Sequence, residues 1–338
     1  MKKNFFKNKS ILITGGTGSF GQAFTNYLLK NKIPLKRIVI FSRDELKQFE
    51  MNKIYNESKY PNIRYFIGDI RDKQRLKLAL NNIDIVVHAA ALKQVAAAEY
   101  NPFEFIKTNV FGAQNLIENC LESSVKQVIA LSTDKASSPI NLYGATKLCS
   151  DKIFIAANNI KGKKNIKFSI VRYGNVMGSR GSVLEIFLRQ KQSKIFHITD
   201  EKMTRFNINM HDAINTVIFS LINLKGGEIL VPKLPSFKII DLAKAVSEIN
   251  KINIIGARQG EKIHEEMISI YDSPKTIDIG KYYLILNEKN IINYKNFKFM
   301  ENNFSYKSNE NKNFLKIDDL KKIIKLFLQD YQSNNKFL

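Results

Sequence analysis

A glycine-rich stretch near the start of the chain constrains the fold more than any other feature. In "ILITGGTGSFG" (11–21), glycines follow a short apolar run in G-x-x-G-x-x-G spacing and precede a helix-like segment. The first glycine permits a tight turn, the second lets a pyrophosphate approach the backbone, and the third lets the helix pack on the strand. The helix N-terminus then offers unpaired N–H groups to phosphates. The stretch predicts a dinucleotide site built from Thr14, Gly15, Thr17, Gly18, Ser19, Phe20 and Gly21.

Strand-like and helix-like segments alternate through the first half of the chain. Short apolar runs occupy 10–14, 37–42, 63–70, 83–91, 126–133 and 166–176, and each of the first five precedes a helix-like segment. This alternation is typical of a parallel sheet covered by helices on both faces. We therefore expect an α/β, Rossmann-like doubly wound sheet over 1–176, which binds the dinucleotide. A smaller C-terminal lobe over 177–338 would mainly bind substrate, with some segments returning to the first domain.

The residues after the second strand bear on which dinucleotide binds. A site for NAD usually has an acidic residue at this strand end, whereas here "FSRDE" places Ser42 and Arg43 first. A hydroxyl and a guanidinium suit a 2′-phosphate, so the sequence favours NADP, although Asp44 keeps NAD open. Asp69 is expected to reach the adenine. Further expected cofactor contacts are Ile70, Ala89, Ala90, Ala91, Lys93 and Asn109.

The chain is strongly basic, with a formal net charge of +22 and a pI near 9.7. Because the lysines are spread along the whole chain, we expect no nucleic-acid binding but a field that attracts an anionic substrate. No apolar run reaches the roughly 18 residues that span a bilayer, and the N-terminus lacks a secretory signal, which predicts a cytoplasmic protein. The cysteines and histidines show no metal-ligand spacing, so no metal is expected.

One segment, "LSTDKASSPINLYGATK" (131–147), concentrates reactive groups. Tyr143 and Lys147 form Y-x-x-x-K and share one helix face, so the ammonium, together with a positive nicotinamide, is expected to lower the pKa of the phenol. Thr133 can hydrogen-bond the same substrate oxygen. Asp134 and Lys135 are either a solvated surface pair or a second set of proton-transfer groups, and their setting favours the second interpretation.

Several motifs together give a specific resemblance. "STDKASSPINLYGATK", "FSRDELKQFEM", "HAAALKQVAAAEYNP", "RYGNVMGSRGSV", "ITDEKMTRFNI" and "GEKIHEEMIS" resemble the inverting UDP-N-acetylglucosamine 4,6-dehydratases of the extended short-chain dehydrogenase/reductase superfamily, which start pseudaminic acid biosynthesis. The resemblance covers about residues 8–325. Gln94, Ala96, Glu185 and Gln259 depart from the usual family residues around the substrate, which we interpret as drift or altered affinity.

The resemblance implies a reaction on a UDP-hexose. Tyr143, as phenolate, removes the C4 hydroxyl proton while hydride passes from C4 to NADP. Lys135, as a neutral amine, is the expected base at C5, and protonated Asp134 is the expected acid for the C6 hydroxyl. Hydride returns to C6, and a proton adds to C5 from the opposite face. The roles of Asp134 and Lys135 could be shared or swapped, since an ion pair between them would oppose both protonation states.

The resemblance also implies substrate contacts and an assembly. The expected contacts, besides the catalytic residues, are Lys93, Asn175, Arg180, Thr199, Met203, Arg205, Arg258 and Glu261, with the arginines and Asn175 on the phosphates. The expected partners are UDP-N-acetylglucosamine and further copies of the chain, as a dimer or hexamer. Two alternatives stay open: a UDP-sugar C4-epimerase, which needs Tyr143 and Lys147 but no acid–base pair, and a non-catalytic NADP-binding scaffold.

Overall fold

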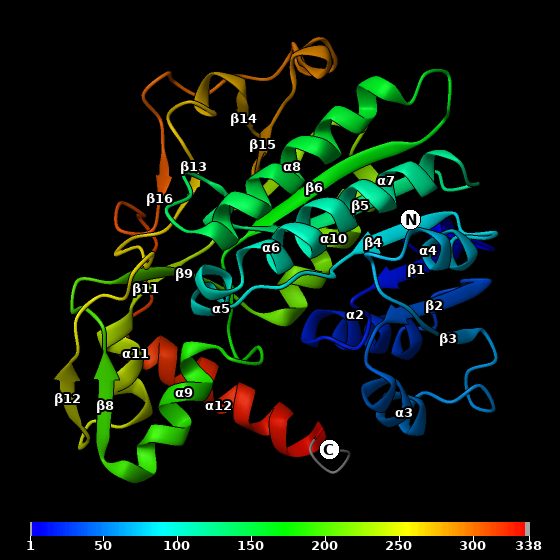
Figure 1. Cartoon of the computed structure of the whole chain (residues 1–338). Helices are drawn as coiled ribbons and strands as arrows, with labels where there is room; N and C mark the ends of the chain where they lie inside the picture. Colours follow the sequence, from blue (N-terminus) through cyan, green and yellow to red (C-terminus); the bar gives the residue numbers. More distant parts are fainter. Residues whose placement is uncertain (1, 335–338) are drawn as a thin grey trace.

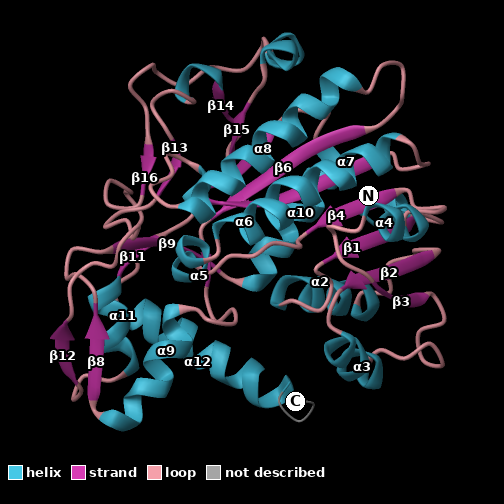
Figure 2. Ribbon diagram, viewed as in Figure 1, coloured by secondary structure: helices cyan, strands magenta, loops and turns pink. Residues whose placement is uncertain are grey.

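A computed structural model describes residues 2–334 of the chain. Within these residues, one nine-stranded sheet has the order β14-β15-β10-β6-β5-β4-β1-β2-β3 (Figures 1 and 2). Within this order, the neighbouring strands β10, β6, β5, β4, β1, β2 and β3 all run parallel. Strand β15 pairs antiparallel with β10, and β14 pairs antiparallel with β15. This confirms the α/β, Rossmann-like prediction. Their bounds are β1 Ser10–Thr14, β2 Arg37–Ser42, β3 Ile63–Ile67, β4 Ile85–His88, β5 Gln127–Thr133, β6 Lys167–Tyr173, β10 Ile229–Pro232, β14 Thr276–Asp278 and β15 Tyr282–Ile285.

Both faces of the sheet are covered by helices, as the alternation predicts. Strand β1 shows why: all five residues of "SILIT" are buried, with Ile11 and Ile13 in one core and Leu12 in the other. Side chains alternate across a strand, so a strand buried on both sides must be apolar throughout. The first core is closed by α2 (Ser19–Lys30), α3 (Glu45–Ile54) and α10 (Met210–Asn223), and the second by α4 (Lys73–Ala79), α7 (Gly112–Leu121) and α8 (Leu142–Ile160).

The second half of the chain builds a lobe with its own core, which includes Leu184, Phe196, Leu242 and Leu320. Its elements are α9 (Val183–Gln190), α11 (Ile239–Val246) and α12 (Ile317–Asn334), with the small sheets β7 (Asn175–Val176), β9 (Thr204–Ile208) and β11 (Ser236–Lys238); β8 (Ile195–Ile198) and β12 (Lys251–Ile254); and β13 (Glu266–Ile268) and β16 (Tyr306–Lys307). However, α10, β10, β14 and β15 come from the same half and complete the large sheet.

The carboxyl ends of the parallel strands point toward this lobe (Figure 1). Ligands of open α/β sheets bind at that edge. The shorter elements are α1 (Lys2–Phe6), α5 (Val95–Tyr100), α6 (Pro102–Phe105), the π-helical η1 (Ile106–Phe111) and the 3₁₀ helices η2 (Asp134–Ala136), η3 (Lys191–Ser193), η4 (Ser273–Lys275) and η5 (Glu288–Tyr294). Among the described residues, no helix combines the length and apolarity that crossing a membrane requires.

Candidate active site

The glycine-rich loop between β1 and α2 has the shape of a phosphate cradle. Gly15 has φ +64°, and a Cβ there would lie 2.8 Å from the backbone nitrogen of Ala90, in the loop after β4. Gly21 packs on Gly16, where a Cβ would approach to 2.5 Å. Helix α2 begins after Gly18 without a side-chain cap, so its first N–H groups remain available to an anion. These features fit a dinucleotide pyrophosphate.

The loop after β4 is fixed by buried polar groups. Thr14 Oγ1 lies 2.8 Å from Nδ1 of His88 and accepts a hydrogen bond from the backbone N–H of Ala90 at 3.3 Å. Burial, with a further contribution from Lys147, lowers the pKa of His88 to about 3, so the imidazole stays neutral. The side chain of Asn109, predicted to contact the cofactor, accepts from the Leu92 N–H and donates to the Leu92 carbonyl, each at 2.9 Å. Its amide therefore holds this loop in place.

The residues after β2 divide between helix capping and solvent. Asp44 caps α3, accepting from the Lys47 N–H at 3.0 Å, and lies 2.6 Å from the Lys47 ammonium. Arg43 keeps half of its side chain exposed, 3.5 Å from Asp69. Asp69, predicted to reach the adenine, is also held by Arg71 at 2.7 Å. Asp44 is thus engaged by its own helix, whereas the Arg43 side chain is half exposed to solvent at the expected adenosine end of the site.

Other predicted cofactor residues are packed into the protein. The Ser42 hydroxyl is buried and accepts from the Gln48 side chain at 3.0 Å. Phe20 stacks on Phe24 with ring centroids 5.5 Å apart. Ile70 is buried, and a Cβ on Gly112 of α7 would lie 2.7 Å from it. These side chains support the walls of the predicted site.

Strand β5, helix η2 and helix α8 bring the catalytic stretch together. Thr133 ends β5, and Asn141 caps α8 by accepting from the Gly144 N–H at 2.8 Å. Gly144 is required by this packing, since a Cβ there would lie 2.3 Å from the Lys135 carbonyl oxygen. The absent side chain lets α8 approach η2 and places Tyr143 against the end of β5.

A continuous set of polar contacts runs through this stretch. The Thr133 hydroxyl lies beside the Tyr143 phenol, acts to lower its pKa, and donates to Asp134 Oδ1 at 3.0 Å. The Lys135 ammonium lies 3.1 Å from the same Oδ1. Asp134 is fully buried, and its Oδ2 has no hydrogen-bond partner among residues 2–334. Asp134 is therefore not a solvated surface charge.

Glu265, which the sequence analysis did not select, is the second carboxylate at Lys135. Its Oε1 lies 2.8 Å from the Lys135 ammonium and 3.6 Å from Arg205 Nε, and its side chain is 2% exposed. It stands in "GEKIHEEMIS", from which only Glu261 was chosen. No local pattern separates these glutamates, because Glu265 precedes a short strand whose place is set by distant contacts.

The protonation states differ in part from those expected. Burial, then the Glu265 charge, raises the pKa of Asp134, which agrees with a protonated acid. Burial alone would lower the pKa of Lys135, but the Asp134 and Glu265 carboxylates outweigh it and raise that pKa well above its usual value. The predicted neutral amine is therefore wrong for the resting protein: two carboxylates hold Lys135 as an ammonium.

Tyr143 also departs from its expected state. Among the protein's own groups, burial dominates and raises the pKa of the phenol to about 12, although Lys135 and Thr133 oppose it. The expected lowering by Lys147 is not found; its ammonium donates to the Leu131 carbonyl at 2.9 Å. Burial lowers the pKa of Lys147, which Asp151 opposes.

Asp151 is a second residue that the sequence analysis missed. It lies one turn beyond Lys147 on the buried face of α8. Its carboxylate accepts from Ser132 at 2.7 Å and pairs with Arg172 at 3.2 Å, both on neighbouring strands. The spacing of four residues from Lys147 was a signal that could have identified it.

Several predicted substrate residues are engaged within the second lobe. Arg205 is buried, donates to two backbone carbonyls at 2.8 and 3.0 Å, and lies 3.7 Å from Glu261. Thr199 donates to the buried Met203 sulfur at 3.0 Å. Exposed Arg258 shares a turn with Glu261, whose carboxylate accepts from the Arg258 N–H at 3.4 Å. Of the two arginines, Arg258 is the one left open to a phosphate.

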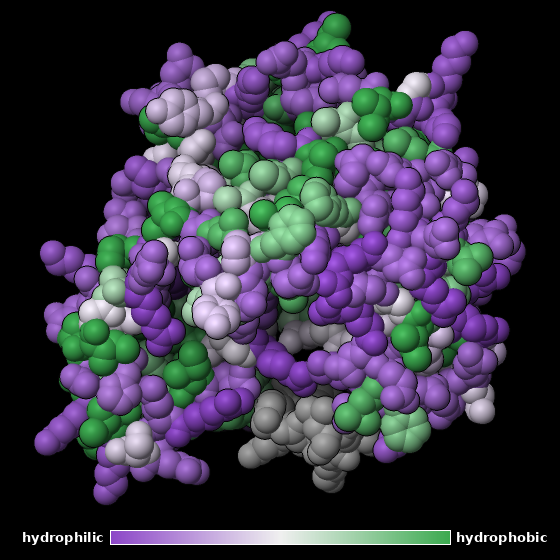
Figure 3. All heavy atoms as spheres, in the orientation of Figure 1, coloured by the Kyte–Doolittle hydropathy of each residue, from purple (hydrophilic) through white to green (hydrophobic). Residues whose placement is uncertain are grey.

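Arg180 lies on the cofactor side of the molecule. Its N–H donates to the Ser19 hydroxyl at 3.3 Å, and its carbonyl accepts from the Lys93 ammonium at 3.0 Å. Glu185, one of the departures from the family pattern, shapes the same turn by accepting from the Gly181 N–H. Asn175 lies on β7, paired in register with Asn207 of β9, where the two lobes meet. A hollow opens between the lobes on the face shown in Figure 3.

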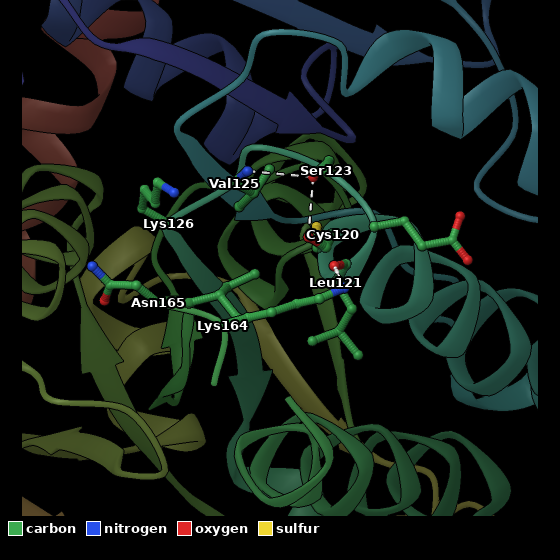
Figure 4. A pocket seen from close by; sticks show the side chains of 9 residues that line it. Cys120, Leu121, Ser123, Val125, Lys126, Lys164 and Asn165 are labelled. Carbon is green, nitrogen blue, oxygen red and sulfur yellow. Dashed lines mark hydrogen bonds between the residues drawn. The ribbon is translucent and has the colours of Figure 1, made fainter. Parts of the chain in front are cut away.

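A separate pocket lies at the opposite edge of the sheet, near the amino ends of β5 and β6 (Figure 4). Its lining includes Cys120, Ser123, Lys126 and Lys164. Ser123 donates to the Cys120 carbonyl at 3.0 Å. Burial raises the pKa of the Cys120 thiol, so this sulfur is not a nucleophile. The pocket carries no reactive group that the site above requires.

Comparisons with known proteins agree with this geometry. The family described as polysaccharide biosynthesis protein matches residues 11–287. A UDP-N-acetylglucosamine 4,6-dehydratase (inverting) from Campylobacter jejuni is 56% identical over 282 residues, covering 83% of each chain. A UDP-glucose 4-epimerase from Rickettsia typhi is 42% identical, covering 86% of this chain and 87% of the relative.

Among solved structures, that of Pen from Bacillus thuringiensis has a TM-score of 0.87 at 36% identity, covering 95% of this chain and 99% of that one. Sequence and structure thus match over most of the chain, including the glycine loop, the catalytic stretch and the second lobe. The chain therefore belongs to the polysaccharide biosynthesis protein family, among the relatives of the inverting UDP-N-acetylglucosamine 4,6-dehydratases.

Proposed function

We propose that this protein removes water from C4 and C6 of UDP-N-acetylglucosamine with inversion at C5, as an NADP-dependent hydro-lyase. The product would be a UDP-2-acetamido-2,6-dideoxy-4-keto-L-arabino-hexose, the first intermediate of a pseudaminic acid-type pathway. The observation that carries the proposal is the fully buried Asp134, whose Oδ1 accepts from the Thr133 hydroxyl at 3.0 Å, with that hydroxyl beside the Tyr143 phenol. This couples an acid for C6 to the residue that acts at C4. Assembly into a dimer or hexamer, and a cytoplasmic location, stay predictions.

The glycine cradle, the open N-terminus of α2 and the small residues after β4 fit a nicotinamide dinucleotide. When bound, this group supplies a hydride acceptor for C4 and then a hydride donor for C6. We propose NADP over NAD because Asp44 is turned into its helix cap while Arg43 is half exposed. A guanidinium there suits a 2′-phosphate.

The chain's own groups then supply the proton transfers. Tyr143 would accept the C4 hydroxyl proton as phenolate, a form that the positive charge of a bound nicotinamide favours over the neutral phenol of the protein alone, with the Thr133 hydroxyl beside the same oxygen. Asp134, protonated through burial and the Glu265 charge, donates to the C6 hydroxyl, which leaves as water. The proton taken from the C4 hydroxyl then passes from Tyr143 through Thr133 to Asp134, where it replaces the proton that Asp134 gave to the C6 hydroxyl. Lys135 lies beside Asp134 and would remove the proton from C5.

Deuterium labelling tests the proposal. The protein is incubated with UDP-N-acetylglucosamine and NADP in heavy water. We expect a product that has lost one water and carries deuterium at C5. A product of unchanged mass with mixed C4 configuration would instead identify a C4-epimerase, the activity named for the Rickettsia relatives. Binding of NADP without any change in the sugar would favour the scaffold alternative.

A further inference from the structure

The ammonium state of Lys135 conflicts with its proposed role as the base at C5, and the inference below rests on the proposed function. A base at C5 must accept a proton, yet the resting Lys135 is an ammonium between two carboxylates. A resting ammonium cannot accept a proton until it has passed its own to a neighbour. The only groups close enough among the described residues are the carboxylates of Asp134 and Glu265, at 3.1 and 2.8 Å.

The two carboxylates are not equivalent. Burial and the Glu265 charge raise the pKa of Asp134, whereas the cations Lys135 and Arg205 outweigh burial and lower the pKa of Glu265. Environments that push two pKa values apart assign the acid and the base of a pair. Asp134 therefore already holds a proton for the C6 hydroxyl, and Glu265 is the carboxylate that is ionised and can accept one.

The setting of Glu265 suits a proton acceptor. Its side chain is 2% exposed, and its Oε2 is buried without a hydrogen-bond partner among the described residues. Its backbone N–H is fixed by the Ser308 hydroxyl at 2.9 Å. Asp134 Oδ2 is likewise buried and unpartnered. Two such oxygens around one ammonium are costly to bury as ionised acceptors, which favours a proton on one of the two carboxylates.

The charged groups that face this cluster come from several elements. Helix η2 supplies Asp134 and Lys135, β9 supplies Arg205, and the turn before β13 supplies Lys262. Lys262 donates to the Ser137 carbonyl at 2.7 Å, and Glu266 accepts from Ser138. The Lys135 side chain is still 22% exposed. A substrate that covers it removes the remaining water, and a dry site favours the neutral forms of an ion pair.

We propose that Glu265 is a positioning residue that acts through Lys135: it keeps the acid proton on Asp134 and takes the ammonium proton of Lys135 when the amine is needed as a base. In this step the N–H bond of Lys135 breaks and an O–H bond forms on Glu265. The free amine then takes the C5 proton while Asp134 protonates the leaving C6 hydroxyl. A proton from water then adds to C5 from the opposite face, Lys135 keeps the proton it took from C5, and Glu265 releases its proton to water, so the cluster ends as it began.

The variant Glu265→Gln tests this, since an amide of the same shape cannot accept the proton. We expect water loss and deuterium incorporation at C5 to fall at least a hundred-fold. Reduction of the cofactor by C4 oxidation does not use Glu265, so absorbance of reduced cofactor should accumulate, and KM should stay within about threefold. Loss of the Glu265 charge should also move the basic limb of the kcat profile to lower pH, because the pKa of Asp134 falls. Wild-type rates and pH profile in Glu265→Gln would overturn the proposal.

Two further variants keep the test decisive. Glu265→Asp retains a carboxylate and should recover elimination at least tenfold over Glu265→Gln, and equal rates would overturn the proposal. If the Gln variant does not fold, a folded Glu265→Asp protein that loses elimination without accumulating reduced cofactor would overturn it. Glu228→Gln is the matched control, a fully buried glutamate at the amino end of β10. It should lose stability without accumulating reduced cofactor. A wild-type protein that forms no dehydrated sugar would refute the proposed function instead.

Discussion

His88 makes the stability of this fold depend on pH in a way that can be calculated. The imidazole is 2% exposed, contacts the Phe154 ring at 5.4 Å between centroids and bonds Thr14. Burial lowers its pKa from 6.5 to about 3. Between these values the unfolded chain binds a proton that the folded protein does not. The contribution of His88 is therefore fully present above about pH 6.5 and is lost as pH falls toward 3.

The magnitude follows from one proton. One proton corresponds to about 1.4 kcal/mol of unfolding free energy for each pH unit. From pH 6.5 to 4.5 the loss is about 2 kcal/mol, a large part of the 5–15 kcal/mol typical of a domain. His88→Asn removes the titrating ring, so its stability should fall less steeply with acid than that of the wild type.

Urea unfolding at several pH values measures this difference. Other titrating groups are present in both proteins and cancel, so the stability gap should narrow by about 1.4 kcal/mol per pH unit below 6.5. Thr14→Val is the control, because it removes the hydrogen bond but keeps the buried ring, and its slope should match the wild type. Parallel curves for wild type and His88→Asn would refute a neutral, buried imidazole.

Two further predictions concern the site. Gly144→Ala places a Cβ 2.3 Å from the Lys135 carbonyl; the forced shift should cost about 1–3 kcal/mol in thermal or urea unfolding and lower kcat at least tenfold, and an unchanged kcat would contradict the packing described. Arg43→Ala removes the half-exposed guanidinium; a lost charge-assisted hydrogen bond of about 1.5–3 kcal/mol should cut the preference for NADP over NAD at least tenfold in cofactor titrations, and an unchanged ratio would argue against a 2′-phosphate contact.

The parts of the site that sequence reasoning found are those with local patterns. The glycine spacing at 15–21 implies a conformation that only glycine supports, and Tyr143 and Lys147 are placed by helix periodicity. Both signals lie within a few residues of chain.

The parts that it missed depend on distant contacts. Glu265 is 130 residues from Lys135 in the sequence, yet it reverses the expected charge state of that lysine. Arg205 was expected on a phosphate and instead lies buried between carbonyls and glutamates. Arg180 is predicted to contact a substrate phosphate, and its backbone N–H donates to Ser19 at the start of α2; the phosphate contact stays a prediction. An arginine in a sequence does not reveal which side of a cleft it faces.

The sequence by itself determined the alternating sheet, the dinucleotide loop and the identity of the groups at the end of β5. These follow from short-range periodicity and from the conformational limits of glycine. Only the tertiary structure decided the protonation of Asp134, Lys135 and Tyr143. A pKa depends on burial and on charges within a few ångströms, and here those charges come from segments far apart in the chain.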